Sequence, residues 1–416
     1  MSSKFAAWFG RLGFDYDEFS ERRWEIHRAH PNVTLDQYRC RVLHRFGQVV
    51  SSKTIVYLDL NYWINLRKVV LGQQVDPAFV EMHSALTEAA ECGLIVCPLS
   101  FWVFQELLKQ SDSETRKATA ALVDRLSSGV AFVHHAEIVS QEVLHFIRKS
   151  SFRYADVKQW PIHECIWTRT MSFLGDQIPV PTAFSEADQL LIQKNWEDFY
   201  FFVPFEELFA DSRSFPPNFK DILYDVDDIN RRKRQVRLQH RSFKSLFLAE
   251  LMHTIKENEH HWYEAMRYLY YLESGKEEPI NTDAMTEVEK QPTRNLIWFL
   301  FKKNKITNEL PSYHIPAGLY AAACWDTSRQ LKENDVLDFH HAQLAIPYCD
   351  IFLTETYLKS LACGRHLRFD EIYDTVIIAD PGEAVMHLRE KLQKSGKPTE
   401  PILQELFGGD TYARSA

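Results

Sequence analysis

The chain has 416 residues, a length that exceeds the usual size of one hydrophobic core and predicts two structural units. Hydrophobic residues make up 45% of the chain and charged residues 25%, and 14 glycines with 17 prolines are too few for a disordered or fibrous protein. The formal net charge of -9 excludes nucleic-acid binding through overall positive charge, so any such binding must depend on a local patch or a bound metal.

The cysteine pattern and the apolar runs restrict the class of protein further. The 7 cysteines are scattered without any C-x-x-C pair, which indicates neither a disulfide framework nor a zinc ribbon. The first residues lack the apolar core of a secretory signal, and no apolar run approaches the roughly 20 residues that a membrane span needs. The sequence therefore predicts a cytoplasmic protein outside the membrane.

The first 150 residues are predicted to form a helical N-terminal segment followed by alternating strands and helices. Apolar stripes at helical spacing predict a helical N-terminal segment over 1–50. Strands are then predicted at 54–58, 94–98 and 130–133, and helices at 77–91, 101–109, 113–127 and 137–149. Asp76-Pro77 and Ser100 are the expected caps of the first two of these helices. This alternation predicts parallel strands in a sheet covered by helices.

The pattern changes after residue 150 and returns late in the chain. Residues 151–314 are rich in aromatic side chains at helical spacing and contain no convincing series of strands, so a mostly helical insertion is predicted there. Residues 315–416 again alternate, with helices at about 316–331, 337–347 and 355–362, strands at 351–354 and 375–379, and a closing helix after Asp380-Pro381. The second part of the α/β domain is therefore expected over 315–416, and the first part over 51–150.

Four acidic residues stand at the ends of predicted elements. Asp59 follows the first strand, Glu106 lies on the helix after the second strand, Asp338 opens a helix, and Glu355 follows the strand at 351–354. Open α/β sheets bind ligands at the carboxyl ends of their strands. If the strands are neighbours, these carboxylates converge, and a hard cation such as Mg²⁺ would relieve their repulsion. Such a centre could activate water and neutralise charge on a phosphate.

Each acidic residue also has an ordinary structural explanation. Asp59 could be a turn former or a helix cap, Glu106 a solvated surface residue, and Asp338 a charge that the helix dipole stabilises. Asp335 is the better helix cap, and Asp350 could simply end a loop.

The same segments carry a resemblance to a known family. Leu58-Asp59-Leu60-Asn61 resembles the opening L-D-x-N of PIN domains, and Cys97-Pro98-Leu99-Ser100 followed by Glu106-Leu107 is similar to their second block. The segments 334–342 and 348–355 resemble the third and fourth blocks. The resemblance implies a PIN-like three-layer α/β fold with a central parallel sheet over roughly 54–150 and 315–395, interrupted by the long helical insertion.

PIN-like enzymes use three or four acidic residues to hold Mg²⁺ or Mn²⁺ and cut a phosphodiester bond, most often in RNA. The resemblance implies metal-ligand roles for Asp59, Glu106, Asp338 and Glu355, and it implies that Asn61 and Thr354 orient those ligands or the attacking water. Asp is commoner than Glu at the fourth position, so Asp350 is the alternative fourth ligand. The interval between Glu106 and Asp338 is far longer than in compact members of the family.

One basic cluster stands out in this acidic chain. It consists of Arg231, Arg232, Lys233, Arg234, Arg237 and Arg241. Three of these arginines share helical spacing, which predicts a face that lies along a phosphate backbone. Ion pairs with the neighbouring Asp225, Asp227 and Asp228 are the alternative. Glu259-His260-His261 lacks the spacing of a zinc-binding H-E-x-x-H motif.

Two functions from different classes follow from these observations. The first is an endonuclease that depends on Mg²⁺ or Mn²⁺, has RNA as its expected substrate, and serves as a toxin or in defence. Its helical insertion would select the substrate or bind an inhibitory or regulatory protein. The second is a catalytically inactive PIN-like scaffold, which the acidic charge and the Glu at the fourth position favour. The sequence does not decide between RNA and DNA as the substrate, or whether the protein forms a homodimer.

Overall fold

The computed structural model describes residues 3–73, 76–110, 112–150, 160–174, 182–210, 226–275, 285–395, 400–409 and 412. The fold is mixed α/β, with many helices and short strands. The chain divides into two compact units: unit 1 comprises Met1–Val133, His163–Pro217 and Asp380–Ala416, and unit 2 comprises His134–Ile162 and Asn218–Ala379. No helix in the described part of the chain has the length and apolar character needed to cross a membrane.

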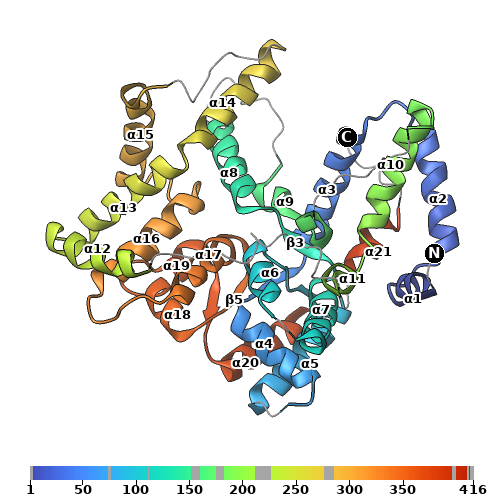
Figure 1. Ribbon diagram of the computed structural model, residues 1–416, viewed down its shortest axis with the longest axis horizontal. Helices are drawn as coiled ribbons and strands as arrows, with labels where there is room; N and C mark the ends of the chain where they lie inside the picture. The colour runs from blue at the N-terminus through green and yellow to red at the C-terminus, as the bar shows by residue number, and fades with distance from the viewer. Residues whose placement is uncertain are drawn as a thin grey trace. The chain divides into compact units, whose positions relative to one another are not determined.

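Unit 1 combines short strands with helices from both ends of the chain (Figure 1). Its elements are α1 (Ser3–Arg11), α2 (Tyr16–Ala29), α3 (Leu35–Ser51), β1 (Thr54–Leu58), α4 (Leu60–Val70), α5 (Pro77–Glu91), β2 (Ile95–Val96), α6 (Phe101–Leu108), α7 (Ser113–Ser127), β3 (Val130–Phe132), β4 (Trp167–Arg169), the 3-10 helix η2 (Thr170–Leu174), α10 (Glu186–Tyr200), α11 (Phe205–Ala210), α20 (Pro381–Ser395) and α21 (Ile402–Phe407). The short helix α9 (Ile162–Cys165) lies where the chain returns to this unit.

The strands of unit 1 form where the sequence has short β-branched and aromatic runs. β1 is buried beyond its first residue and pairs in parallel with β2, with Thr54 opposite Ile95. A parallel bridge between Leu99 and Ala131 joins the chain after β2 to β3. β4 pairs with β3 in the antiparallel direction. The predicted strands at 54–58 and 130–133 are confirmed, whereas β4 is an additional strand inside the region predicted to be helical.

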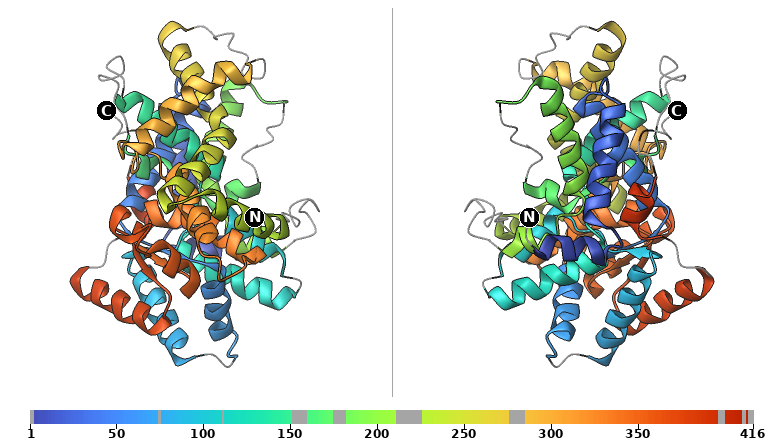
Figure 2. Two further views of the ribbon diagram at one scale, coloured as in Figure 1. Left: turned by 90° about the vertical axis from the view of Figure 1, so that its left-hand side faces the viewer. Right: turned by 90° about the vertical axis from the view of Figure 1, so that its right-hand side faces the viewer.

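Helices cover the strands of unit 1. The carboxylates of Asp76 and Asp112 accept hydrogen bonds from the backbone N–H groups of Ala78 and Thr115, and so cap α5 and α7. Figure 2 shows α20, the long helix near the red end of the colour scale, next to the blue α5, and these two helices are in contact. The C-terminal part of the chain therefore completes a layer that the first hundred residues begin.

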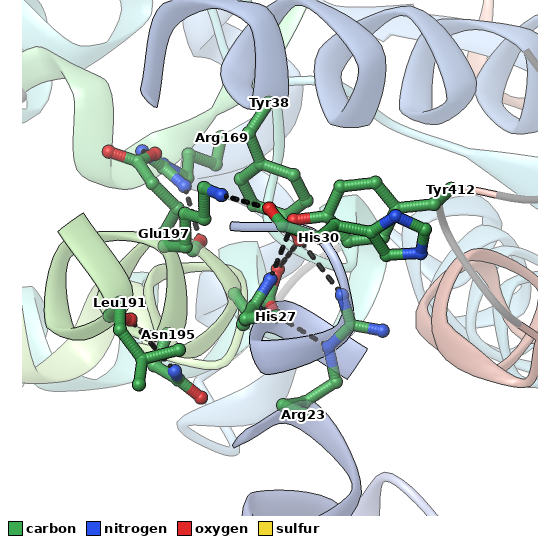
Figure 3. A network of polar contacts seen from close by, with 11 residues as sticks. Arg23, His27, His30, Tyr38, Arg169, Leu191, Asn195, Glu197 and Tyr412 are labelled. Carbon is green, nitrogen blue, oxygen red and sulfur yellow. Dashed lines mark hydrogen bonds and ion pairs between the residues drawn. The ribbon is translucent and has the colours of Figure 1, made fainter. Parts of the chain in front are cut away.

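A buried ionic network joins the N-terminal helices to α10 (Figure 3). The carboxylate of Asp198 accepts hydrogen bonds from Arg23 Nε at 2.6 Å, from His27 Nε2 at 2.8 Å and from the Tyr38 hydroxyl. The side chains of Asp198 and Arg23 are 0% and 1% exposed. The Tyr412 hydroxyl donates to His27 Nδ1 at 2.9 Å when Nε2 carries the proton. The network thus ties α2, α3, α10 and the C-terminal segment together.

The charges in this network are matched. Burial alone would raise the pKa of Asp198, but Arg23, His27 and Tyr38 outweigh burial and hold that pKa below its ordinary value. Burial lowers the pKa of His27, which favours the neutral imidazole that bridges Asp198 and Tyr412. Because Asp198 and His27 have lower pKa values in the folded than in the unfolded protein, both groups stabilise the fold above their unfolded-state pKa values. This stabilisation is lost as the pH falls through the folded-state pKa values.

Unit 2 is mostly helical and carries two short strands (Figure 1). Its elements are α8 (His135–Ser150), α12 (Val226–Gln239), α13 (Phe243–Glu257), α14 (Glu259–Ser274), α15 (Glu287–Lys302), α16 (Pro311–Trp325), α17 (Glu333–Tyr348), β5 (Ile351–Leu353), α18 (Thr356–Ala362), α19 (Phe369–Tyr373) and β6 (Val376–Ile378). An apolar core forms where α8 and α13 to α16 pack, and it includes Leu251, Trp262 and Tyr313.

The two strands of unit 2 pair in parallel. Ile351 lies opposite Val376, and Leu353 lies opposite Ile378. Both predicted strands are confirmed, and all three residues of β5 are buried. The preceding helices differ from prediction at their boundary, because α16 ends at Trp325 and α17 begins at Glu333. Residues 326–332 therefore form a loop, although helix was predicted to about residue 331. Asp338, which was predicted to open a helix, lies in the second turn of α17.

A buried carboxylate lies among the helices of unit 2. Glu142 on α8 is 0% exposed, and it accepts hydrogen bonds from the Ser312 N–H at 3.0 Å, the Ser312 hydroxyl at 2.6 Å and the Tyr348 hydroxyl at 2.5 Å. The carboxylate thereby satisfies an N–H at the start of α16. Burial raises the pKa of Glu142 to about 7, although these hydrogen bonds act in the opposite direction.

Replacing Glu142 with glutamine is expected to change how the stability of the protein depends on pH. A folded-state pKa of about 7, above the ordinary 4.5, means that folding is favoured below pH 4.5 and that this contribution is lost as the pH rises through 7. As the pH rises from 5 to 7.5, Glu142 should therefore lower the free energy of unfolding of the unmodified protein by roughly 2–3 kcal/mol. Glu142→Gln should lack this decrease, so its stability relative to the unmodified protein should rise by the same amount over this range. Urea unfolding at several pH values measures this difference.

The exposed Glu137 on the same helix provides the control for this experiment. Glu137→Gln should leave the pH dependence within about 0.5 kcal/mol of that of the unmodified protein. Burial lowers the pKa of His314 to about 4, which gives stability the opposite pH dependence. That contribution is common to all variants and cancels in the comparison. A pH-independent difference between Glu142→Gln and the unmodified protein would contradict the prediction.

Candidate functional site

Asp59 stands at the carboxyl end of β1 and is 2% exposed. Its Oδ1 accepts a hydrogen bond from the Tyr62 N–H at 3.3 Å, so the side chain caps α4. The helix-cap interpretation of Asp59 is therefore confirmed. Capping occupies one carboxylate oxygen and is compatible with a second role for the group, because a carboxylate has several lone pairs.

The surroundings of Asp59 contain acidic residues that the sequence patterns did not single out. Burial raises the pKa of Tyr62, and the nearby charges of Asp59, Asp380 and Glu383 raise it further. The Tyr62 hydroxyl is buried and has no hydrogen-bond partner in the described part of the chain. Asp380 follows β6 as Asp59 follows β1, and its Oδ1 accepts from the Glu383 N–H at 2.8 Å. The position of Asp380 at the end of a predicted strand could have identified it as a candidate site residue from the sequence.

Asn61 and Glu106 belong to the same unit as Asp59. Asn61 is exposed on the first turn of α4, where its Oδ1 accepts a hydrogen bond from Asn65 Nδ2 at 2.9 Å. Glu106 is half-buried on α6, which is in contact with α4. The predicted cap of α6 is confirmed, because the Ser100 hydroxyl accepts a hydrogen bond from the Val103 N–H at 3.2 Å.

The other predicted site residues belong to unit 2. Asp338 is half-buried on α17, and Glu355 is exposed at the residue before α18, without a side-chain hydrogen bond to that helix. Asp335 is the third residue of α17 and not its N-cap, which is Lys332, but its Oδ2 accepts from the Lys332 N–H at 2.7 Å and so satisfies a backbone group at the start of the helix. Thr354 is 0% exposed, and its hydroxyl has no hydrogen-bond partner among the residues that the structure describes.

Glu355 and Asp350 occupy opposite ends of β5. Glu355 follows the carboxyl end, whereas Asp350 precedes the amino end, where its carbonyl accepts from the Val376 N–H at 2.9 Å. At about 3.3 Å per residue, the intervening strand separates the two positions by roughly 10 Å or more. Asp350 therefore does not fit as a ligand at the end of β5 that carries Thr354, and Glu355 is the better candidate for the fourth position.

The basic cluster on α12 and just after it is only partly exposed. Arg231, Arg232 and Arg241 are exposed. Lys233 is 3% exposed, and its Nζ donates to the Arg329 carbonyl at 2.5 Å. The prediction that Lys233 contacts nucleic acid is therefore wrong, because its ammonium group is used within unit 2.

Arg237 is also occupied within unit 2. Its guanidinium lies 3.6 Å from the centre of the Trp325 ring, and its Nη1 donates to the His240 carbonyl at 3.1 Å. These contacts argue against the predicted role in phosphate binding. The side chain of Arg234, which belongs to the same prediction, lies outside the described part of the structure.

The donor chemistry of the candidate residues suits a hard divalent cation, since Asp59, Glu106, Asp338 and Glu355 all offer carboxylate oxygens. The buried hydroxyl of Thr354 beside Glu355, which has no hydrogen-bond partner among the described residues, is a further oxygen suited to such a site. Among the described residues, no group of three or more His, Cys, Asp or Glu side chains is arranged to hold a metal ion. The convergence of the candidates from the two units stays a prediction.

No family model matches the chain, and neither a curated protein nor a solved structure matches it. The PIN-like resemblance therefore stays a prediction that rests on the motifs around Asp59, Glu106, Asp338 and Glu355. The mixed α/β fold with parallel strand pairs stands independently of that resemblance.

Proposed function

We propose that the protein is a metal-dependent endonuclease of the PIN-like type, with RNA as the expected substrate. The observation that carries the proposal is the placement of acidic residues after parallel strands: Asp59 follows β1, Glu355 comes two residues after β5, and Asp380 comes two residues after β6. The carboxyl ends of parallel strands are where open α/β sheets bind their ligands. One of these carboxylates, that of Asp59, is 2% exposed.

In this proposal Asp59, Glu106, Asp338 and Glu355 would hold Mg²⁺ or Mn²⁺. When bound, such an ion lowers the pKa of water and neutralises the charge that develops on a phosphate. The Thr354 hydroxyl, which is buried and lacks a partner among the described residues, would orient a neighbouring ligand. Asn61 is exposed on the first turn of α4 and would do the same for Asp59.

Substrate contacts would come from the exposed part of the basic cluster. Arg231 and Arg232 on α12 and Arg241 just after it are exposed, and guanidinium groups bind phosphate oxygens well. Because the chain carries a net charge of -9, such contacts would have to be local. Binding should then weaken steeply as salt is added.

The direct test incubates the full chain with labelled single-stranded RNA and DNA in the presence of Mn²⁺, Mg²⁺ or EDTA. The proposal expects internal cleavage with a divalent ion and none with EDTA. Titration of Mn²⁺ followed by electron paramagnetic resonance gives a second readout that does not depend on the choice of substrate. An absence of both Mn²⁺ binding and cleavage would overturn the proposal.

A catalytically inactive scaffold is the second candidate function. The exposure of apolar side chains on two helices of unit 2 favours it. Tyr271 and Leu272 on α14 and Leu296 and Phe299 on α15 are each at least half exposed. Exposed apolar surface of this kind is common where proteins bind partners. A scaffold would bind a partner protein and leave both nucleic acids intact in the cleavage assay.

A role as a toxin or in defence belongs to the same proposal. An endoribonuclease released from control would degrade the RNA of the cell that makes it. Induced expression of the unmodified protein should then slow the growth of a host, whereas the Asp59→Asn variant at equal abundance should not. Equal growth inhibition by both proteins would argue against this role.

A further inference from the structure

α12 holds the loop of residues 326–332 by specific polar contacts. Asn230 Nδ2 donates to the Leu331 carbonyl at 2.9 Å, and the Leu331 N–H donates back to Asn230 Oδ1 at 2.9 Å. Lys233 Nζ donates to the Arg329 carbonyl at 2.5 Å. Two side chains that are a turn apart on one helix therefore fix the backbone on both sides of residue 330.

Arg329, whose backbone is held in this way, connects two other helices through its side chain. Its Nη2 donates to Asp335 Oδ1 on α17 at 2.6 Å, and its guanidinium carbon lies 3.4 Å from the centre of the Tyr357 ring on α18. Asp335 is 4% exposed, so this ion pair is shielded from water on the acidic side. A planar guanidinium can pair with a carboxylate and stack on an aromatic ring at once, and a lysine cannot.

Candidate metal ligands lie on one of the helices that Arg329 joins, α17, and at the residue before the other, α18. Asp338 lies three residues after Asp335, which places both on neighbouring turns along one side of α17. Glu355 lies two residues before Tyr357, where β5 leads into α18. A movement of Arg329 would therefore change the position of Asp338 relative to that of Glu355.

We propose that Arg329 is a positioning residue that sets the spacing between Asp338 and Glu355, and that Asn230 and Lys233 of α12 hold it in place. The inference rests on the proposed metal-dependent function. It assigns to part of the basic cluster a role in organising the carboxylates, in place of the predicted contact with nucleic acid. It also gives α12 a second function in the site, through Asn230 and Lys233, beside the substrate contacts proposed for Arg231 and Arg232.

The test measures Mn²⁺ affinity and cleavage for the full chain and for Arg329→Gln. Residues that orient metal ligands typically contribute 10- to 100-fold to metal affinity. Arg329→Gln is therefore expected to raise the dissociation constant for Mn²⁺ by about 10-fold or more, and excess Mn²⁺ should restore most of kcat. Arg329→Lys keeps a charge near Asp335 but loses the flat stacking on Tyr357, so an intermediate affinity is expected.

Arg368 supplies the matched control, because it forms an exposed ion pair with Glu371 in the same unit. Arg368→Gln should leave Mn²⁺ affinity and kcat unchanged. Hydrogen exchange adds a readout that needs no metal: Arg329→Gln should speed exchange in the first turns of α17 and α18, and Arg368→Gln should not. If Arg329→Gln fails to fold, Tyr357→Leu removes the stacking contact alone and tests the same point.

The outcomes separate this inference from the proposed function. If the unmodified protein binds Mn²⁺ and cleaves nucleic acid while Arg329→Gln and Tyr357→Leu match the Arg368→Gln control, the positioning role is wrong and the nuclease stands. If the unmodified protein neither binds Mn²⁺ nor cleaves, the proposed function fails and the positioning role fails with it. Weakened Mn²⁺ binding that excess metal overcomes supports both.

Discussion

Asp59→Asn should abolish most of the metal-dependent cleavage while leaving the fold nearly as stable as before. Asparagine caps a helix as well as aspartate does, so the hydrogen bond from the Tyr62 N–H to the side-chain oxygen is retained. The substitution removes only the negative charge of a side chain that is 2% exposed. Losing about 3 kcal/mol of metal-dependent stabilisation of the transition state corresponds to a roughly 100-fold lower rate.

Asp112→Asn is the matched control for this experiment. Asp112 caps α7 in the same unit, where its Oδ2 accepts from the Thr115 N–H at 2.7 Å, and it was not predicted to bind metal. The control should retain full cleavage and full Mn²⁺ affinity. Rates for both variants, taken together with their thermal unfolding midpoints, separate a loss of chemistry from a loss of fold. Cleavage by Asp59→Asn within about threefold of the control would place the chemistry elsewhere.

Asp198→Ala should cause the largest loss of stability in unit 1. The substitution leaves Arg23 and His27 buried at 1% exposure without the carboxylate that both contact. Removing one partner of a buried ion pair costs about 3–5 kcal/mol, because the other charge stays desolvated and unpaired. Urea unfolding followed by circular dichroism measures the change in the free energy of unfolding.

A second variant distinguishes the free-energy cost of a buried unpaired charge from the contribution of the ion pair to the free energy of unfolding. Replacing both partners with apolar residues of similar size, in Arg23→Met with Asp198→Leu, should destabilise the protein less than Asp198→Ala alone. Glu186→Ala, at an exposed position on the same helix, should change the free energy of unfolding by less than about 0.5 kcal/mol. A cost for Asp198→Ala close to that of the control would mean that the network contributes little.

Local chemistry in the sequence was enough to predict many elements. The run Thr54–Leu58 is short, β-branched and aromatic, and it forms β1 as predicted. Asp76 and Pro77 start α5 at the predicted residue because the cap and the fixed proline torsion act within one turn. The predicted strand at 351–354 corresponds to β5, and the three residues of this strand are buried.

Features that depend on distant contacts were not predictable in the same way. The sequence pattern predicts helix to about residue 331, but residues 326–332 form a loop because hydrogen bonds from Asn230 and Lys233, about a hundred residues earlier, hold it. β4 has three residues, too few for an alternating pattern, and it forms by pairing with β3. The burial of Lys233 likewise depends on a carbonyl that periodicity within α12 does not reveal.

The residues of the candidate site also differ in whether local sequence patterns predict them. Positions at strand ends, such as Asp59 and Glu355, follow from local patterns and were predicted. Asp380, which contributes to the surroundings of Tyr62, carries the same strand-end signal and was passed over. The roles of Arg329 and Tyr357 depend on three helices meeting, which no single segment of the sequence encodes.

The composition of unit 1 from three separate stretches of chain has a consequence for its synthesis. Its last stretch, Asp380–Ala416, supplies α20 beside α5 and the Tyr412 hydroxyl that bonds to His27. A ribosome delivers these residues only after all of unit 2 has been made, so the N-terminal helices can form these contacts only after that point. A nascent chain halted at residue 379 should therefore remain open to proteases in its first hundred residues, even with all of them already made.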